Sequence, residues 1–182
     1  QVFGFTANII TVFLSGIVGS QISSIKSLST LPTSLSVLGT AIFTILAAKI
    51  MRKIGRRLGF IFGALVSSVT CLLAVLAIIQ QNFILFCISH LILGLGIAFA
   101  HQYRFAAAES VEKEKAPKAI SIILFGGIIS AFLGPSLANY SKDLVSENLY
   151  VGSYLALALL TFIPSLLFLF YEGKSKVEKN LL

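Results

Sequence analysis

Six long apolar stretches limit the folds that are open to this chain. They lie at about residues 2–20, 31–51, 58–79, 83–103, 119–140 and 149–171. Because a helix rises 1.5 Å per residue, about 20 apolar residues cross a hydrocarbon core of roughly 30 Å. We therefore predict an all-α membrane protein in which residues 1–182 form a single domain, a bundle of six transmembrane helices.

Composition favours the same class. Hydrophobic residues make up 57% of the chain and charged residues 12%, about half the charged share of an ordinary soluble domain. So few charges cannot cover the apolar surface of a soluble domain, and the hydrophobicity excludes disorder. The net charge of +7 is spread over short basic clusters between the apolar stretches. We therefore expect the lipid bilayer as partner and no nucleic acid.

Basic residues in the short connections set the orientation. One side carries eleven of them: Lys49, Arg52, Lys53, Arg56, Arg57, Lys113, Lys115, Lys118, Lys174, Lys176 and Lys179. The opposite side carries Lys26 and Lys142. We predict that both termini are cytoplasmic.

Polar side chains inside the apolar stretches form two stripes. In the first stretch Asn8, Thr11 and Ser15 follow one another at spacings of three and four, which places them on one helix face. The second stretch has a similar stripe at spacing four: Ser36, Thr40 and Thr44. Since an unpartnered polar group is costly in hydrocarbon, the stripes either line an aqueous path or bond within and between helices.

The fourth stretch carries two histidines in different settings. His90 lies well inside it, where an imidazole either relays a proton or forms a neutral contact with a neighbouring helix. His101, Gln102, Arg104 and Glu109 gather at the cytoplasmic end. There Arg104 either extends toward the headgroups or pairs with Glu109, in a gating or structural role.

The fifth stretch carries a row of small residues, each four apart: Gly126, Ser130, Gly134 and Ala138. Such a row lets another helix approach closely. Pro135 lies within it and removes one helical donor, which predicts a bend.

Three motifs resemble those of one transporter family. The connection between the second and third stretches is similar to the Gly-x-x-x-Asp-Arg-x-Gly-Arg-Arg motif of the major facilitator superfamily. Gly55, Arg56 and Arg57 match that motif, Lys53 replaces an arginine, and Arg52 stands where the family has its acid. The chain thus resembles the N-terminal six-helix half of such a transporter, in a bacterial subgroup of uncharacterised permeases.

The other two motifs lie in the fourth and fifth stretches. His90, Gly94 and Gly96 are similar to the family's Arg-x-x-x-Gly-x-Gly, with His90 in place of an arginine implicated in proton coupling. Gly134 and Pro135 resemble the glycine-proline signature of the antiporters.

The resemblance implies secondary active transport of a small solute by alternating access, coupled to an ion or proton gradient, in a bacterial inner membrane. Asn8, Thr11, Ser15 and His90 would lie on the substrate or proton path, and the basic connection would act at the cytoplasmic gate. Family members hold substrate between two six-helix halves. Because the chain begins at Gln1, we expect a fragment of a longer protein, or a half that pairs with another copy or a separate second half. The alternative function is a non-transporting membrane scaffold that binds a partner.

Enzymatic chemistry is not expected. The sequence lacks the Gly-x-x-x-x-Gly-Lys-Ser/Thr phosphate loop that direct use of ATP requires. His90 and His101 are eleven residues apart on one predicted helix, which separates them by about 16 Å along its axis, too far to share a metal. Cys71 and Cys87 lie in apolar stretches, as expected of buried free thiols. We therefore predict no cofactor and no metal.

Overall fold

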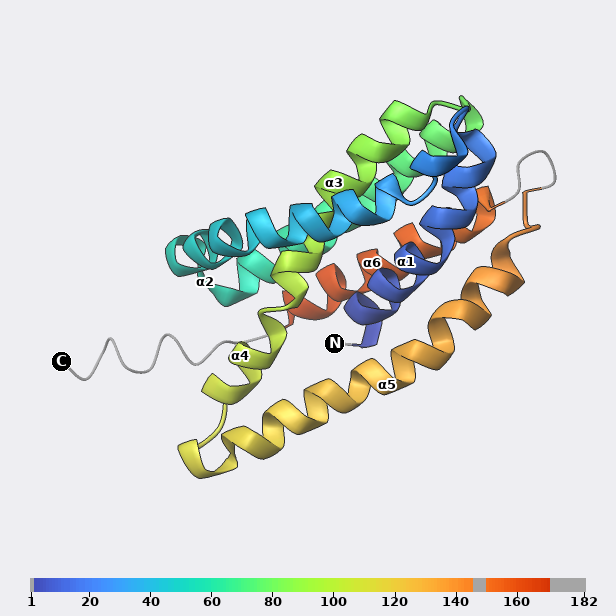
Figure 1. Cartoon of the computed structure of the whole chain (residues 1–182). Coiled ribbons are helices and arrows are strands. Elements are labelled where there is room, and N and C mark those ends of the chain that lie inside the picture. Colours follow the sequence, from blue (N-terminus) through green and yellow to red (C-terminus); the bar gives the residue numbers. More distant parts are fainter. Residues whose placement is uncertain (1, 146–149, 171–182) are drawn as a thin grey trace.

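Helices account for the regular structure in the part of the chain that the structure describes. That structure is a computed structural model, and it describes residues 2–145 and 150–170. The elements in chain order are α1 (Val2–Ile22), η1 (Lys26–Leu28), α2 (Leu31–Ile79), α3 (Phe83–Ala100), α4 (Tyr103–Glu109), η2 (Lys113–Lys115), α5 (Ala116–Ser141) and α6 (Val151–Leu169) (Figure 1). The predicted all-α membrane fold class is confirmed.

Among the described residues, five helical stretches are long and apolar enough to cross a membrane: Val2–Ile22, Lys26–Ile79, Phe83–Glu109, Lys113–Ser141 and Val151–Leu169. The second of them contains both the second and the third predicted stretches. Residues 149 and 171, where the last predicted stretch begins and ends, lie outside the described residues, as do the three lysines of the tail.

The backbone of α2 is interrupted at Gly55, which has φ 86° and ψ 164°. Glycine adopts a positive φ at little cost because it has no Cβ. The helix turns back at this point (Figure 1). We refer to residues 31–54 as the first arm of α2 and to residues 56–79 as the second arm.

Local sequence signals explain where several helices begin. The Asn82 side chain accepts a hydrogen bond from the backbone N–H of Leu85 at 3.0 Å and so caps α3. Pro117 lies in the first turn of α5, where its missing donor costs nothing. Thr30 occupies the cap position of α2, but its side chain makes no capping bond.

The third helix packs against both arms of α2 through glycines. A Cβ added at Gly94 would lie 2.5 Å from the backbone nitrogen of Thr40 in the first arm. A Cβ added at Gly96 would collide with the hydroxyl of Ser67 in the second arm. Small residues therefore let the three helical segments meet at backbone distance.

Two apolar clusters form the core. The larger joins α1, the second arm of α2, α3 and α6, with Leu14, Phe86 and Leu157 fully buried. The smaller includes Met51 and Phe60, on either side of the Gly55 turn. The outward face of α5 is exposed, as expected of a helix that meets lipid or another protein segment.

Candidate functional site

The polar stripe of α1 divides into bonded and unbonded groups. The Thr11 hydroxyl donates to the carbonyl of Ala7 at 2.8 Å, within its own helix. The Ser15 hydroxyl forms one hydrogen bond with the hydroxyl of Thr33 in the first arm of α2. Asn8 is half-buried, and none of the described residues forms a hydrogen bond with its side-chain amide. Asn8 thus retains two donors and an acceptor for another molecule.

The stripe in the first arm of α2 bonds back along its own helix. The Ser36 hydroxyl donates to the carbonyl of Thr33 at 2.8 Å. The Thr40 and Thr44 hydroxyls donate to the carbonyls four residues earlier, at 2.8 and 2.6 Å. These hydroxyls need no partner from another helix.

His90 forms a closed contact between α3 and α6. Its Nδ1 lies 2.8 Å from the carbonyl oxygen of Phe86, and its Nε2 lies 3.0 Å from the hydroxyl of Tyr154. Because a carbonyl only accepts, Nδ1 carries the proton and Nε2 accepts from the tyrosine. Both side chains are fully buried. A role of His90 in proton transfer stays a prediction, and it requires the bond to Tyr154 to break.

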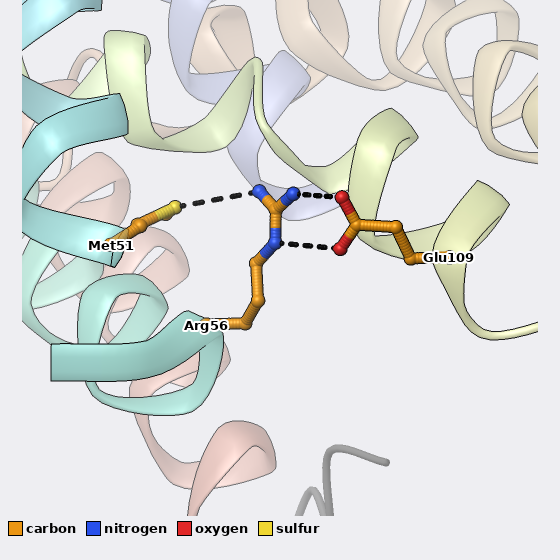
Figure 2. Close-up of polar contacts among 3 residues, drawn as sticks. All are labelled: Met51, Arg56 and Glu109. Atoms are coloured by element: carbon orange, nitrogen blue, oxygen red, sulfur yellow. Dashed lines mark hydrogen bonds and ion pairs between the residues drawn. The ribbon is translucent and has the colours of Figure 1, made fainter. Parts of the chain in front are cut away.

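An ion pair joins the turn of α2 to the end of α4. The Arg56 Nε donates to Oε2 of Glu109 at 3.1 Å, and Nη2 pairs with Oε1, so the guanidinium and carboxylate meet at two points (Figure 2). The Met51 sulfur lies 3.9 Å from the Arg56 Nη1. The side chains are 28% and 61% exposed, so water reaches the pair. Arg52 and Lys53, earlier in the same connection, are exposed.

The next arginine binds the end of α6. The Arg57 Nε donates to the carbonyl of Phe168 at 3.1 Å, and Nη2 donates to the carbonyl of Leu169. Carbonyls in the last turn of a helix lack helical donors and carry partial negative charge, which a guanidinium satisfies. Adjacent arginines therefore connect the turn of α2 to two other helices.

Arg104 does not form an ion pair with Glu109. That pairing was one of the two roles considered for Arg104. Its guanidinium carbon lies 5.0 Å from the centre of the Phe105 ring, within the range of a cation–π contact. The Glu109 carboxylate faces Arg56 instead, because the turn of α2 lies beside the end of α4.

The remaining residues of this end lie where α3 meets α4. His101 is half-buried, and its ring meets the ring of Phe5 edge-on, with centroids 5.6 Å apart. Gln102 is 8% exposed. This junction therefore lies against the beginning of α1.

The row of small residues predicted to pack closely is buried in α5: Gly126, Ser130, Gly134 and Ala138. The Ser130 hydroxyl lies 3.0 Å from the carbonyl of Val2 in α1. A Cβ added at Gly134 would lie 3.0 Å from Cγ2 of Ile9. The row thus faces α1, and Pro135 lies next to it inside α5.

A small cavity lies between α1, the second arm of α2, α3 and α6. Its volume is about 20 Å³, with Ala7, Ser67, Gly96 and Thr161 among its lining residues. That volume holds about one water molecule. It lies in the interior of the helix bundle and is too small for a metabolite.

Among the described residues, no group of three or more His, Cys, Asp or Glu side chains is placed to hold a metal ion. Cys71 and Cys87 are buried free thiols.

Several contacts were not predicted from the sequence, among them the ion pair of Arg56 with Glu109. Tyr154 was not identified as the partner of His90, although a phenol in an apolar stretch also needs a hydrogen-bond partner. The contact of Arg57 with α6 had no comparable signal, because its acceptors are backbone carbonyls.

Known proteins resemble the chain over most or nearly all of its length. A sequence model of the Major Facilitator Superfamily matches residues 2–181. The riboflavin transporter RfnT of Brucella anthropi is 35% identical over 180 residues, 99% of this chain and 45% of that protein. Two uncharacterised MFS-type transporters of Bacillus subtilis, YdeG and YddS, are 27% and 24% identical over 79% and 76% of this chain.

The chain spans less than half the length of these relatives, namely 45%, 33% and 32%. No solved structure matches it. The family match covers all the described helices and agrees with their apolar character. This chain belongs to the Major Facilitator Superfamily.

Proposed function

We propose that the chain forms one six-helix half of a secondary active transporter that moves a small solute by alternating access. The observation that carries this proposal is the family match over residues 2–181. The 45% share of the riboflavin transporter supports the assignment to one half. Transporters of this kind hold substrate between two halves. The second half is the rest of a longer polypeptide, another copy, or a separate chain.

The substrate class in this proposal is riboflavin or a similar flat heteroaromatic solute. Support comes from the 35% identity to a riboflavin transporter over 99% of the chain. A flavin has apolar ring faces and a polar edge. The unbonded amide of Asn8 offers donors and an acceptor for such an edge, and Phe5 lies one turn earlier on α1.

The gate in this proposal is the turn of α2, with its contacts from Arg56 and Arg57. A partly exposed ion pair contributes about 0.2–1 kcal/mol, so the Arg56–Glu109 pair can open in each cycle. Arg57 meanwhile keeps α6 attached to the turn. These residues act on the motion of the helices and do not contact substrate.

Orientation and coupling complete the proposal. Eleven basic residues lie on one predicted side of the membrane and two on the other, which supports cytoplasmic termini. The membrane in this proposal is a bacterial inner membrane. Coupling to a proton gradient runs through His90, and it requires the bond to Tyr154 to open during the cycle.

Riboflavin uptake tests the proposal. Cells that cannot synthesise flavin would express the gene that encodes this chain, with whatever coding sequence follows it. We expect uptake of labelled riboflavin that unlabelled riboflavin inhibits. Replacing Asn8 with Ala should raise KM about fivefold, as expected for one lost hydrogen bond. Gln21→Ala, an exposed change on the same helix, is the control.

Two results would count against the proposal. No uptake, despite membrane expression equal to that of a functional control transporter, would overturn the substrate assignment. Uptake with equal KM in the wild-type and Asn8→Ala proteins would remove Asn8 from the substrate path.

A further inference from the structure

An apolar groove lies where α2 and α3 begin, far from the Arg56 turn. Its volume is about 350 Å³, at the lower end of the range of small-molecule sites. Residues of η1, α2 and α3 line it, among them Leu28, Leu31, Leu35, Phe83, Ile84 and Leu91. Every lining side chain is aliphatic, aromatic or a thiol, so an occupant finds no strong hydrogen-bond partner there.

The depth of the groove matches one leaflet of a bilayer. Leu91 comes eight residues after Phe83, so the groove extends about 12 Å along α3. Half of a hydrocarbon core of roughly 30 Å is close to that depth. Ile84 and Ile88 are 72% and 45% exposed, which leaves the groove open to the surrounding membrane.

One cation lies close in sequence to the groove lining. Lys26 belongs to η1, two residues before Leu28, and is exposed. It is the only charged residue among residues 1–48, and residues 58–103 contain no Asp, Glu, Lys or Arg. Among the described side chains, no carboxylate forms an ion pair with it. Its charge is thus available to an anion at the membrane surface.

We propose that the groove holds one acyl chain of a phospholipid whose phosphate is bound by Lys26. The apolar lining and the depth of the groove suit an acyl chain. The isolated charge of Lys26 suits an anionic headgroup. This site is separate from the proposed substrate path, so lipid binding here does not depend on which solute the transporter moves.

Photolabelling in nanodiscs tests the lipid site. The protein used is the full product of the gene that encodes this chain. The probes are phosphatidylglycerol and phosphatidylcholine that carry the same diazirine-bearing acyl chain, and adducts are mapped by peptide mass spectrometry. We expect adducts at the start of α3, roughly fivefold more with phosphatidylglycerol, as expected for one lysine at an anionic headgroup. Lys26→Gln should remove that preference.

Filling the groove provides the second arm of the test. Ile84→Trp should lower adduct formation at the start of α3 several-fold, and Ile84→Ala should keep it. Phe132→Trp, at a residue of α5 that is 76% exposed and away from the groove, is the matched control. Gel filtration checks that each variant is folded.

Three outcomes would overturn the proposal. One is lipid labelling that is equal on α3 and α5 and that does not fall in the Ile84→Trp variant. Another is a headgroup preference that survives in Lys26→Gln. The third is recovery of protein–protein cross-links at the groove in place of lipid adducts.

Discussion

His90 and Tyr154 join α3 to α6 by a hydrogen bond of 3.0 Å between two fully buried side chains. Phe86 completes the unit, because its carbonyl binds the other nitrogen of His90 and its ring meets Tyr154 edge-on at 5.7 Å. An unpaired polar atom at this depth would be costly in hydrocarbon. The unit therefore fixes the position of α6 against α3.

Tyr154→Phe should lower stability, because it leaves His90 without its inter-helical partner. We expect a loss of roughly 0.6–1.7 kcal/mol, the range for such bonds between membrane helices. Thermal unfolding of the purified protein in detergent measures it. Tyr140→Phe, at a side chain that is 83% exposed, should have no effect. An equal Tm for Tyr154→Phe and wild type would contradict the structural role.

His90→Ala should flatten the pH dependence of uptake if the histidine carries the coupled proton. Tyr154→Phe keeps the imidazole, so that variant should retain the pH dependence while losing stability. Uptake measured at a series of pH values distinguishes the two variants. An unchanged profile in His90→Ala would leave His90 with the inter-helical role alone.

Exchanging the charges of Arg56 and Glu109 should preserve the gate. Arg56→Glu alone brings two carboxylates together, and Glu109→Arg alone brings two guanidiniums together, so each single change should slow uptake. The double exchange restores an attractive pair and should recover much of the rate. Initial uptake rates at equal membrane expression test this, and a double variant no faster than either single one would refute the gating role.

Gly94→Ala should destabilise the packing of α3 against α2. The added Cβ would lie 2.5 to 2.7 Å from backbone atoms of the first arm, and overpacking typically costs about 1–3 kcal/mol. Gly16→Ala is the matched control, since a Cβ there has no heavy atom within 4 Å. Thermal unfolding in detergent should show a lower Tm for Gly94→Ala, and equal values for both variants would contradict the close packing.

Reporter fusions test the predicted orientation. An alkaline phosphatase fusion after Gln81 should be active, because the predicted orientation places that turn outside. A fusion after Lys179 should be inactive and a fluorescent protein at the same place should fold. Activity with the opposite pattern would reverse the topology.

Much of the architecture could be predicted because it depends on local sequence. The class of the fold follows from hydropathy, and the start of α5, where Pro117 lies in the first turn, agrees with backbone chemistry. The two stretches predicted at 31–51 and 58–79 correspond to the two arms of α2, and the positive φ of Gly55 separates them. How the two arms lie against each other was less accessible, because the backbone conformation at Gly55 sets it.

By itself, the sequence determined the membrane class, because about 20 apolar residues suffice to specify each crossing. It also determined the family, because a sequence model of the Major Facilitator Superfamily matches residues 2–181. Only the tertiary structure decided which groups meet. Arg56 and Glu109 are 53 residues apart, His90 and Tyr154 are 64 apart, and Arg57 and Phe168 are 111 apart. Spacing along one helix cannot predict such pairs, since the relative position and rotation of two packed helices determine which side chains come within bonding distance.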